Sequence, residues 1–232
     1  MLVDIFSSFD DYNFVFLSFY MLIWGCSFLF VLWVGQSFWL SSARHLMGLW
    51  GLKSIMFSQV GRVFGGSMGG FCGVLSVLFI MLVILNMTGL IPYVFSPTSH
   101  LVVTLGLGFP LWLVMLMSGM AYNLGSVVAS LMPGGAPSAI GPFLIVVETV
   151  SIMVRPITLS VRLVANMSAG HIVLGLIGVY LSSSLFLSSM LISFVLVMAQ
   201  VGYFLFEVGV SLIQGYIFSL LLTLYSDEHP AH

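Results

Sequence analysis

Charged residues are scarce in this chain. Asp, Glu, Lys and Arg together make up 5% of the 232 residues, whereas 60% of the residues are hydrophobic. Soluble domains carry about 25% charged residues, so the composition excludes a soluble globular protein and predicts one that lies within a lipid bilayer. The formal net charge of -2 provides no basic patch, which argues against nucleic-acid binding.

Cysteine and targeting signals are equally sparse. Cys26 and Cys72 lie in or beside apolar segments, with no His or Cys at metal-site spacing, so we expect packing residues and no metal or cofactor. Three aspartates and no Lys or Arg lie in residues 1–13, the reverse of a secretory or organelle-targeting peptide. No cleavable leader is therefore expected.

Long apolar runs occupy most of the chain. Residues 14–40 are long enough to cross about 30 Å of hydrocarbon as a first transmembrane helix. Residues 71–95 and 99–122 predict two further spans, which form a helical hairpin over 71–122. The proline- and glycine-rich stretch 123–142 predicts a loop or a re-entrant turn.

Basic residues gather in one short segment. Residues 41–64 contain Arg44, Lys53 and Arg62, three of the five basic residues, among apolar side chains. We expect a surface helix near 44–64 that lies on the membrane and does not span it. The positive-inside rule places this helix on the negative side of the membrane and the N-terminus on the other side.

Two long helices are predicted at the end of the chain, over residues 143–180 and 185–225, with the serine run 182–184 between them. A span needs about 20 residues, so helices of this length must tilt strongly, bend or protrude. The fold class predicted is all-α: a single polytopic membrane domain with about five embedded helices and one surface helix, its last two helices forming a tilted hairpin over 143–225.

Polar side chains lie in one stripe on each long helix. At about 100° per residue, one face of the first carries Glu148, Arg155, Arg162 and Asn166. The second repeats a polar residue every seven positions: Ser193, Gln200, Glu207 and Gln214.

A single antiparallel register pairs His171 with Glu207 and Arg162 with Gln214. By ideal helical phase His171 lies about 180° from Arg162, so both pairs require a bend in the helix or a wide interhelical face. Hydrogen bonding between helices explains Ser193, Gln200 and Gln214 without any further function. It does not explain Arg162 and Glu207, because a charge near the bilayer centre costs at least about 2.5–3.5 kcal/mol.

The run VETVSIMVRPITLSVRLVANMSAGH, with its RLxANxxAGH core, closely resembles the most characteristic segment of subunit a of F-type ATP synthase, called subunit 6 in mitochondria. NMTGLIPYVFSPTSHLVVTLGLGFPLW looks like the central hairpin of that family, and EVGVSLIQGYIFSLLLTLYSDEH looks like its C-terminal helix. The resemblance covers about residues 70–228, and residues 1–69 match only in plan.

The resemblance implies a stator subunit that carries protons through two offset half-channels and has no catalytic site of its own. Its implied partners are the rotating c-subunit ring, other membrane-sector and peripheral-stalk subunits, lipid and protons. The implied location is the mitochondrial inner membrane, with the N-terminus on the intermembrane-space side. Arg155 departs from the resemblance, because mitochondrial relatives commonly carry a neutral residue there.

The resemblance also implies a role for each polar position. Arg162 would face the carboxylate of the c-ring and keep the half-channels apart. The remaining positions would form an inlet on the intermembrane-space side (His171 and Glu207), an outlet on the matrix side (Glu148, Ser151 and Asn166) and a neighbour of the arginine (Gln214).

Two other classes of protein compete with this interpretation. A small multipass secondary ion transporter also places ionisable residues at mid-membrane, but transporters typically show paired repeats and broken helices, which this sequence lacks. A purely structural membrane subunit would not need Arg162. Co-purification with a c-ring and a soluble ATPase head would discriminate among the three.

Overall fold

In the computed structural model, all regular secondary structure in the described part of the chain is helical. That part comprises residues 47–63, 70–91, 96–123, 140–187 and 190–227, with isolated helical positions at 25, 29, 125, 127 and 129. Its elements are α2 (Met47–Val60), α3 (Phe71–Gly89), the 3-10 turn η4 (Pro97–Ser99), α4 (Leu101–Tyr122), α6 (Gly141–Leu187) and α7 (Met190–Asp227). The all-α prediction is confirmed.

Four of these helices, α3, α4, α6 and α7, are long and apolar enough to cross a membrane. With 14 residues, α2 is shorter than the roughly 20 that a span requires, in keeping with a predicted helix that does not cross. The predicted first transmembrane helix, residues 14–40, lies outside the described residues except for Gly25 and Leu29, which are helical.

Two predicted helix boundaries were wrong. The serines at 182–184 do not separate two helices but lie inside α6, and α7 begins at Met190 rather than at residue 185. Each of these serine hydroxyls donates a hydrogen bond to the backbone carbonyl three residues earlier, so the helix itself satisfies them. A serine run therefore does not break this helix.

The end of α3 also differs from the prediction. The helix begins after Gly70, whose φ of 83° is a left-handed conformation that glycine adopts without strain. It ends at Gly89 instead of residue 95. Pro92 follows closely, and a proline disfavours helical conformation in the residue before it.

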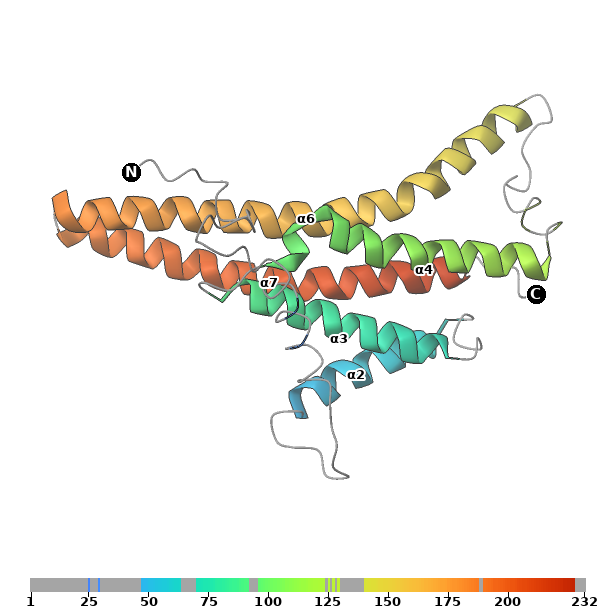
Figure 1. Ribbon diagram of the computed structural model, residues 1–232, viewed down its shortest axis with the longest axis horizontal. Helices are drawn as coiled ribbons and strands as arrows, with labels where there is room; N and C mark the ends of the chain where they lie inside the picture. Colours follow the sequence, from blue (N-terminus) through green and yellow to red (C-terminus); the bar gives the residue numbers. More distant parts are fainter. Residues whose placement is uncertain are drawn as a thin grey trace.

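The two longest helices form the frame of the molecule. In Figure 1, α6 and α7 run antiparallel and side by side, and they are joined at one end of the longest axis. The N-terminal arm of α6 bends away from this pair, and Pro156 lies within the helix, where it removes one backbone hydrogen bond. The tilt of these helices in a membrane stays a prediction.

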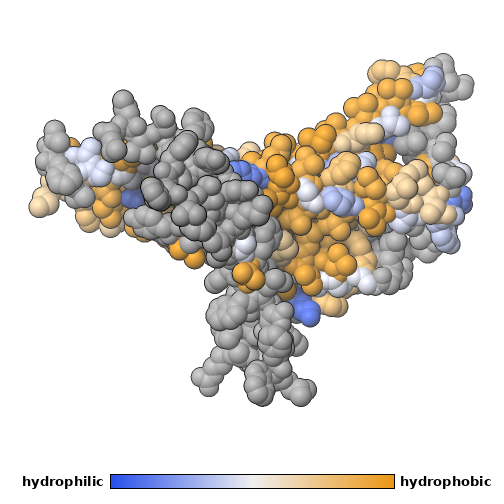
Figure 2. Space-filling view, viewed as in Figure 1, coloured by the Kyte–Doolittle hydropathy of each residue, from blue (hydrophilic) through white to orange (hydrophobic). Residues whose placement is uncertain are grey.

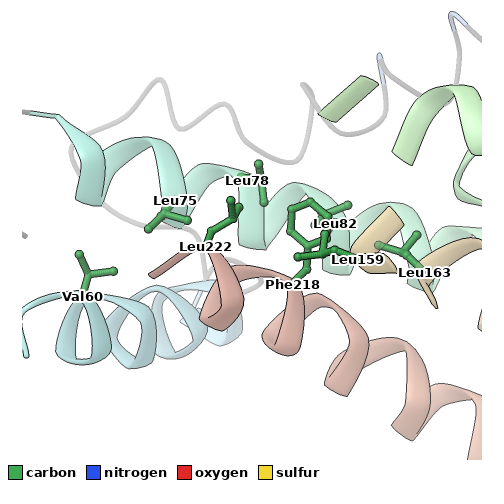
Figure 3. Packing of buried hydrophobic residues seen from close by; sticks show 8 residues of the cluster. All are labelled: Val60, Leu75, Leu78, Leu82, Leu159, Leu163, Phe218 and Leu222. Atoms are coloured by element: carbon green, nitrogen blue, oxygen red, sulfur yellow. The ribbon is translucent and has the colours of Figure 1, made fainter. Parts of the chain in front are cut away.

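The other helices pack around this frame. α3 packs on α7 and α2 packs on α3, while α4 lies against α6. The central apolar cluster joins four of these helices (Figure 3), and consists of Val60, Leu75, Leu78, Leu82, Leu159, Leu163, Phe218 and Leu222. Leu159 and Leu163 place the middle of α6 against α7, which fixes the orientation of the residues between them.

Apolar side chains dominate the outer surface as well. The face shown in Figure 2 is mostly hydrophobic over α4 and the adjoining part of α6, with scattered polar residues. Large exposed residues include Val102 and Val114 on α4 and Met153 and Ile157 on α6. Such a surface suits hydrocarbon or another apolar protein surface.

Candidate functional site

A polar seam runs between α6 and α7. The side-chain nitrogen of Asn166 on α6 donates a hydrogen bond to Oε1 of Gln214 on α7, at 2.9 Å. Farther along the seam, Gly170 faces the Glu207 carboxylate so closely that a Cβ at position 170 would overlap it. The numbers of the facing residues add up to 380 and 377, close to the 378 expected for His171 with Glu207. The predicted register of the hairpin is therefore present.

Glu207 is the most enclosed ionisable residue of this seam, with 3% of its surface exposed. Tyr203, one turn earlier on α7, is hydrogen-bonded to its carboxylate through the phenol group. His171, on α6, lies close enough to interact electrostatically with the same carboxylate. The structure thus brings together the predicted pair, His171 and Glu207, and adds Tyr203, which the sequence analysis missed.

Arg162 lies on a different face of α6. Its side chain is exposed, whereas Leu163, the next residue, is fully buried in the central cluster. Within the described part of the chain, no hydrogen bond or ion pair joins the guanidinium to a partner. The expected neighbour, Gln214, is instead bonded to Asn166, one helical turn beyond Arg162. The arginine is therefore directed outward, and the amides are directed into the seam.

A second polar cluster lies before the bend of α6. Nη2 of Arg155 is 3.4 Å from Oε1 of Glu148, so the two side chains form an ion pair between residues two turns apart on α6. The same guanidinium lies over the ring of Tyr225, on α7, with its central carbon 5.3 Å from the ring centroid. Ser151, on the same arm, has an exposed side chain.

The two clusters lie on opposite sides of Arg162 along α6. Glu148 precedes the arginine by 14 residues, and His171 follows it by nine. On a helix with a rise of about 1.5 Å per residue, these separations correspond to roughly 21 Å and 13 Å. Together they span a distance comparable with the hydrocarbon thickness of a bilayer, about 30 Å.

A third helix contributes a polar residue that the sequence analysis did not select. Asn86 on α3 is completely buried, and its side-chain nitrogen donates to the backbone oxygen of Ser211 at 3.4 Å. Its Oδ1 is buried and has no hydrogen-bond partner among the described residues. Ser211 lies one turn from Glu207, so Asn86 presents a vacant acceptor close to the seam. The sequence does contain a signal for this residue, because Asn86 is a single amide side chain in the otherwise apolar helix α3.

No group of three or more His, Cys, Asp or Glu residues is arranged to hold a metal ion in the part of the chain that the structure describes. Cys72 on α3 is a free, partly buried cysteine that packs at the edge of the central cluster. The chemistry available at the seam is therefore that of hydrogen-bonding and titratable side chains. Such groups can exchange protons along a path.

Four long apolar helices with a carboxylate and an imidazole in an inner seam define a polytopic membrane protein with ionisable groups inside its helical bundle. Residues of this kind within a membrane mark ion and proton pathways.

The chain belongs to the ATP synthase subunit a family. Residues 15–227 match the family model described as ATP synthase A chain. The chain is 46% identical over 156 residues to ATP synthase subunit a of Albinaria caerulea, an alignment that covers 67% of this chain and 72% of the relative. It is 36% identical over 233 residues to the subunit of Drosophila melanogaster, with coverage of 98% and 99%. With the subunit of Locusta migratoria it shares 37% identity over 231 residues, again with coverage of 98% and 99%.

Proposed function

We propose that this protein is the stator subunit through which protons cross the membrane sector of ATP synthase in the mitochondrial inner membrane, and that it couples this flow to rotation of a c-subunit ring. The observation that carries the proposal is that the arginine and the titratable pair lie in different places. Arg162 faces outward from an apolar surface, whereas the titratable pair His171 and Glu207 lies in the seam behind that surface.

The exposed position of Arg162 calls for a partner outside this chain. The exposed residues Val161 and Ala165, adjacent to it on α6, are apolar, so the surrounding surface would otherwise face lipid. A guanidinium in that setting costs at least about 2.5–3.5 kcal/mol without a polar partner. A carboxylate on an apolar ring of another subunit removes this cost. Membership of the subunit a family supports the c-ring as that partner.

The charge of Arg162 determines what it does in the cycle. A guanidinium remains protonated at any physiological pH, so it does not relay protons. It stabilises the anionic form of a carboxylate beside it, which drives that carboxylate to release its proton. Because each unit charge that crosses 100 mV gains about 2.3 kcal/mol, a leak past the arginine would waste the driving force. A fixed cation between two half-channels prevents that leak.

The two polar clusters supply the half-channels. The imidazole of His171 and the carboxylate of Glu207 form the inlet from the intermembrane space, with the phenol of Tyr203 hydrogen-bonded to the carboxylate. Glu148 and Ser151 form the outlet to the matrix. Asn166, which the resemblance assigned to the outlet, lies instead on the inlet side of Arg162. Its hydrogen bond with Gln214 keeps the seam polar between the arginine and the inlet.

The subunit works only as part of the assembly. Nucleotide chemistry belongs to other subunits, and this chain contacts neighbouring membrane-sector and stalk subunits and lipid through its apolar surface. The N-terminus lies on the intermembrane-space side, as the basic residues of α2 and its flanks indicate.

Disulfide cross-linking within the intact complex tests which face meets the ring. A cysteine next to the c-ring carboxylate should cross-link to Val161→Cys or Ala165→Cys, both exposed on α6 beside Arg162. The matched controls are Leu159→Cys, buried on α6, and Val114→Cys, exposed on α4. Cross-linking from Val114 but not from α6 would show that another face meets the ring. Purification without a c-ring or a soluble ATPase head would favour a transporter instead.

A further inference from the structure

The Arg155 side chain contacts residues on two different helices. Its guanidinium pairs with Glu148, two turns earlier on α6, and lies over the ring of Tyr225, near the end of α7. The Arg155 side chain extends in the usual direction, because a long side chain on a helix points back toward the N-terminus. Arg155 therefore reaches toward Glu148 and away from Arg162.

The position of this contact on α6 gives it mechanical importance. Pro156 follows directly, and a proline inside a helix removes one backbone hydrogen bond and weakens that turn. The N-terminal arm of α6 diverges from the α6–α7 pair (Figure 1). The Arg155 contacts span the turn before Pro156, since Glu148 lies two turns earlier on α6 and Tyr225 lies on α7.

The ion pair is partly enclosed on the side of the arginine. The side chain of Arg155 is 23% exposed and that of Glu148 is 42% exposed, so the guanidinium is the more enclosed partner. A cation over an aromatic face is attracted by the negative face of the ring, an interaction that desolvation strengthens. Arg155 thus joins a carboxylate on α6 to an aromatic ring on α7.

We propose that Arg155 is a positioning residue for the outlet, which holds the Glu148 carboxylate beside α7 and sets the direction of the α6 arm. This inference rests on the proposed function, in which Glu148 receives protons released near Arg162. Arg155 itself does not relay protons, because its guanidinium does not titrate. Without Arg155, the Glu148 carboxylate moves away from α7 together with the N-terminal arm of α6. The outlet then lacks a carboxylate at a fixed position.

A double-mutant cycle on the intact complex tests whether Arg155 acts through Glu148. ATP-driven proton pumping in inverted vesicles should fall about two- to fivefold in Arg155→Gln, the range of one partly exposed ion pair. Glu148→Gln should also lose pumping, and the double variant should be no worse than Glu148→Gln alone. Losses that multiply in the double variant would overturn the inference. The control Arg62→Gln removes an exposed arginine beyond α2 and should pump normally.

Conservative variants keep the test informative if Arg155→Gln fails to assemble. Arg155→Lys retains a cation beside Glu148 and should recover part of the pumping lost in Arg155→Gln. Tyr225→Phe retains the ring face and should pump faster than Tyr225→Leu. A lysine variant no better than glutamine, or equal loss in both Tyr225 variants, would contradict the positioning role.

The same vesicles separate this inference from the function on which it rests. ATP synthesis that survives Arg162→Ala would overturn the proposed function, and the role of Arg155 would fall with it. If Arg162→Ala abolishes synthesis while the losses from Arg155→Gln and Glu148→Gln multiply, the proposed function stands and only the positioning role fails.

Discussion

Gly170 on α6 lies directly against the carboxylate of Glu207 on α7, with no room for a side chain between them. Glycine at this position lets the two helices approach where the buried carboxylate must meet His171. The neighbouring sequence contains other glycines, but Gly175 and Gly178 have open space where a Cβ would lie. Close approach at Gly170 is therefore specific to the place where α6 meets Glu207.

We expect Gly170→Ala to displace Glu207 and to slow proton-driven ATP synthesis strongly. Overpacking of this kind typically costs about 1–3 kcal/mol, enough to shift the carboxylate from its place without unfolding the bundle. Synthesis and proton uptake in vesicles measure the effect. Gly175→Ala is the matched control, and equal loss in both variants would show that helix flexibility, not the space beside Glu207, is what matters.

Arg162→Ala should abolish proton-driven ATP synthesis and raise passive proton leak, because the barrier between the half-channels is then lost. Assembly should continue, since Arg162 is exposed and removal of an intramembrane charge lowers the cost of insertion. Arg162→Lys should also fail to support normal synthesis, because an ammonium is a compact donor that loses its proton more readily on burial. Vesicles with the alanine variant that synthesise ATP at a near-normal rate would refute the role of Arg162.

Cysteines at positions 148 and 171 should react with a membrane-impermeant thiol reagent from opposite sides of the membrane. The two sites lie on either side of Arg162 along α6, one at each proposed half-channel. The background chain would carry serine in place of Cys26 and Cys72. Leu163→Cys, which is fully buried, is the unreactive control. Labelling of both test sites from one compartment would exclude two separate channels.

Leu163→Ala should lower the stability of the subunit by about 2–5 kcal/mol, as for other buried leucines. Leu163 is completely buried in the cluster that joins α6 to α3 and α7, so truncation leaves a cavity behind Arg162. The thermal unfolding of the purified complex measures this. Val161→Ala, at an exposed neighbouring position, should change it little, and a reversed order would contradict the observed orientation of α6.

The sequence predicted the helices well because their length and apolar character are local properties. It also predicted the α6–α7 register, since two polar stripes of known phase can be aligned along antiparallel helices. Helix ends were less predictable. The serines at 182–184 resemble a linker in composition, yet their hydroxyls bond to carbonyls of the same helix.

Contacts between side chains from distant segments could not be predicted in this way. Asn86 meets Ser211 across 125 positions of sequence, and Arg155 meets Tyr225 through the direction of a long flexible side chain. Helical phase alone also paired Gln214 with Arg162, whereas in the structure Gln214 accepts a hydrogen bond from the side-chain amide of Asn166. Such choices depend on how far each side chain reaches once the helices are packed.

The apolar face around Arg162 has a consequence for motion. In the proposed function, a c-ring that slides past the exposed apolar residues Val161 and Ala165 meets few fixed hydrogen bonds that must break at every step, because apolar contacts are non-directional. Arg162 adds a strong electrostatic interaction to this surface. The resistance to rotation and the position at which the ring pauses would then be set by different residues on the same stretch of α6.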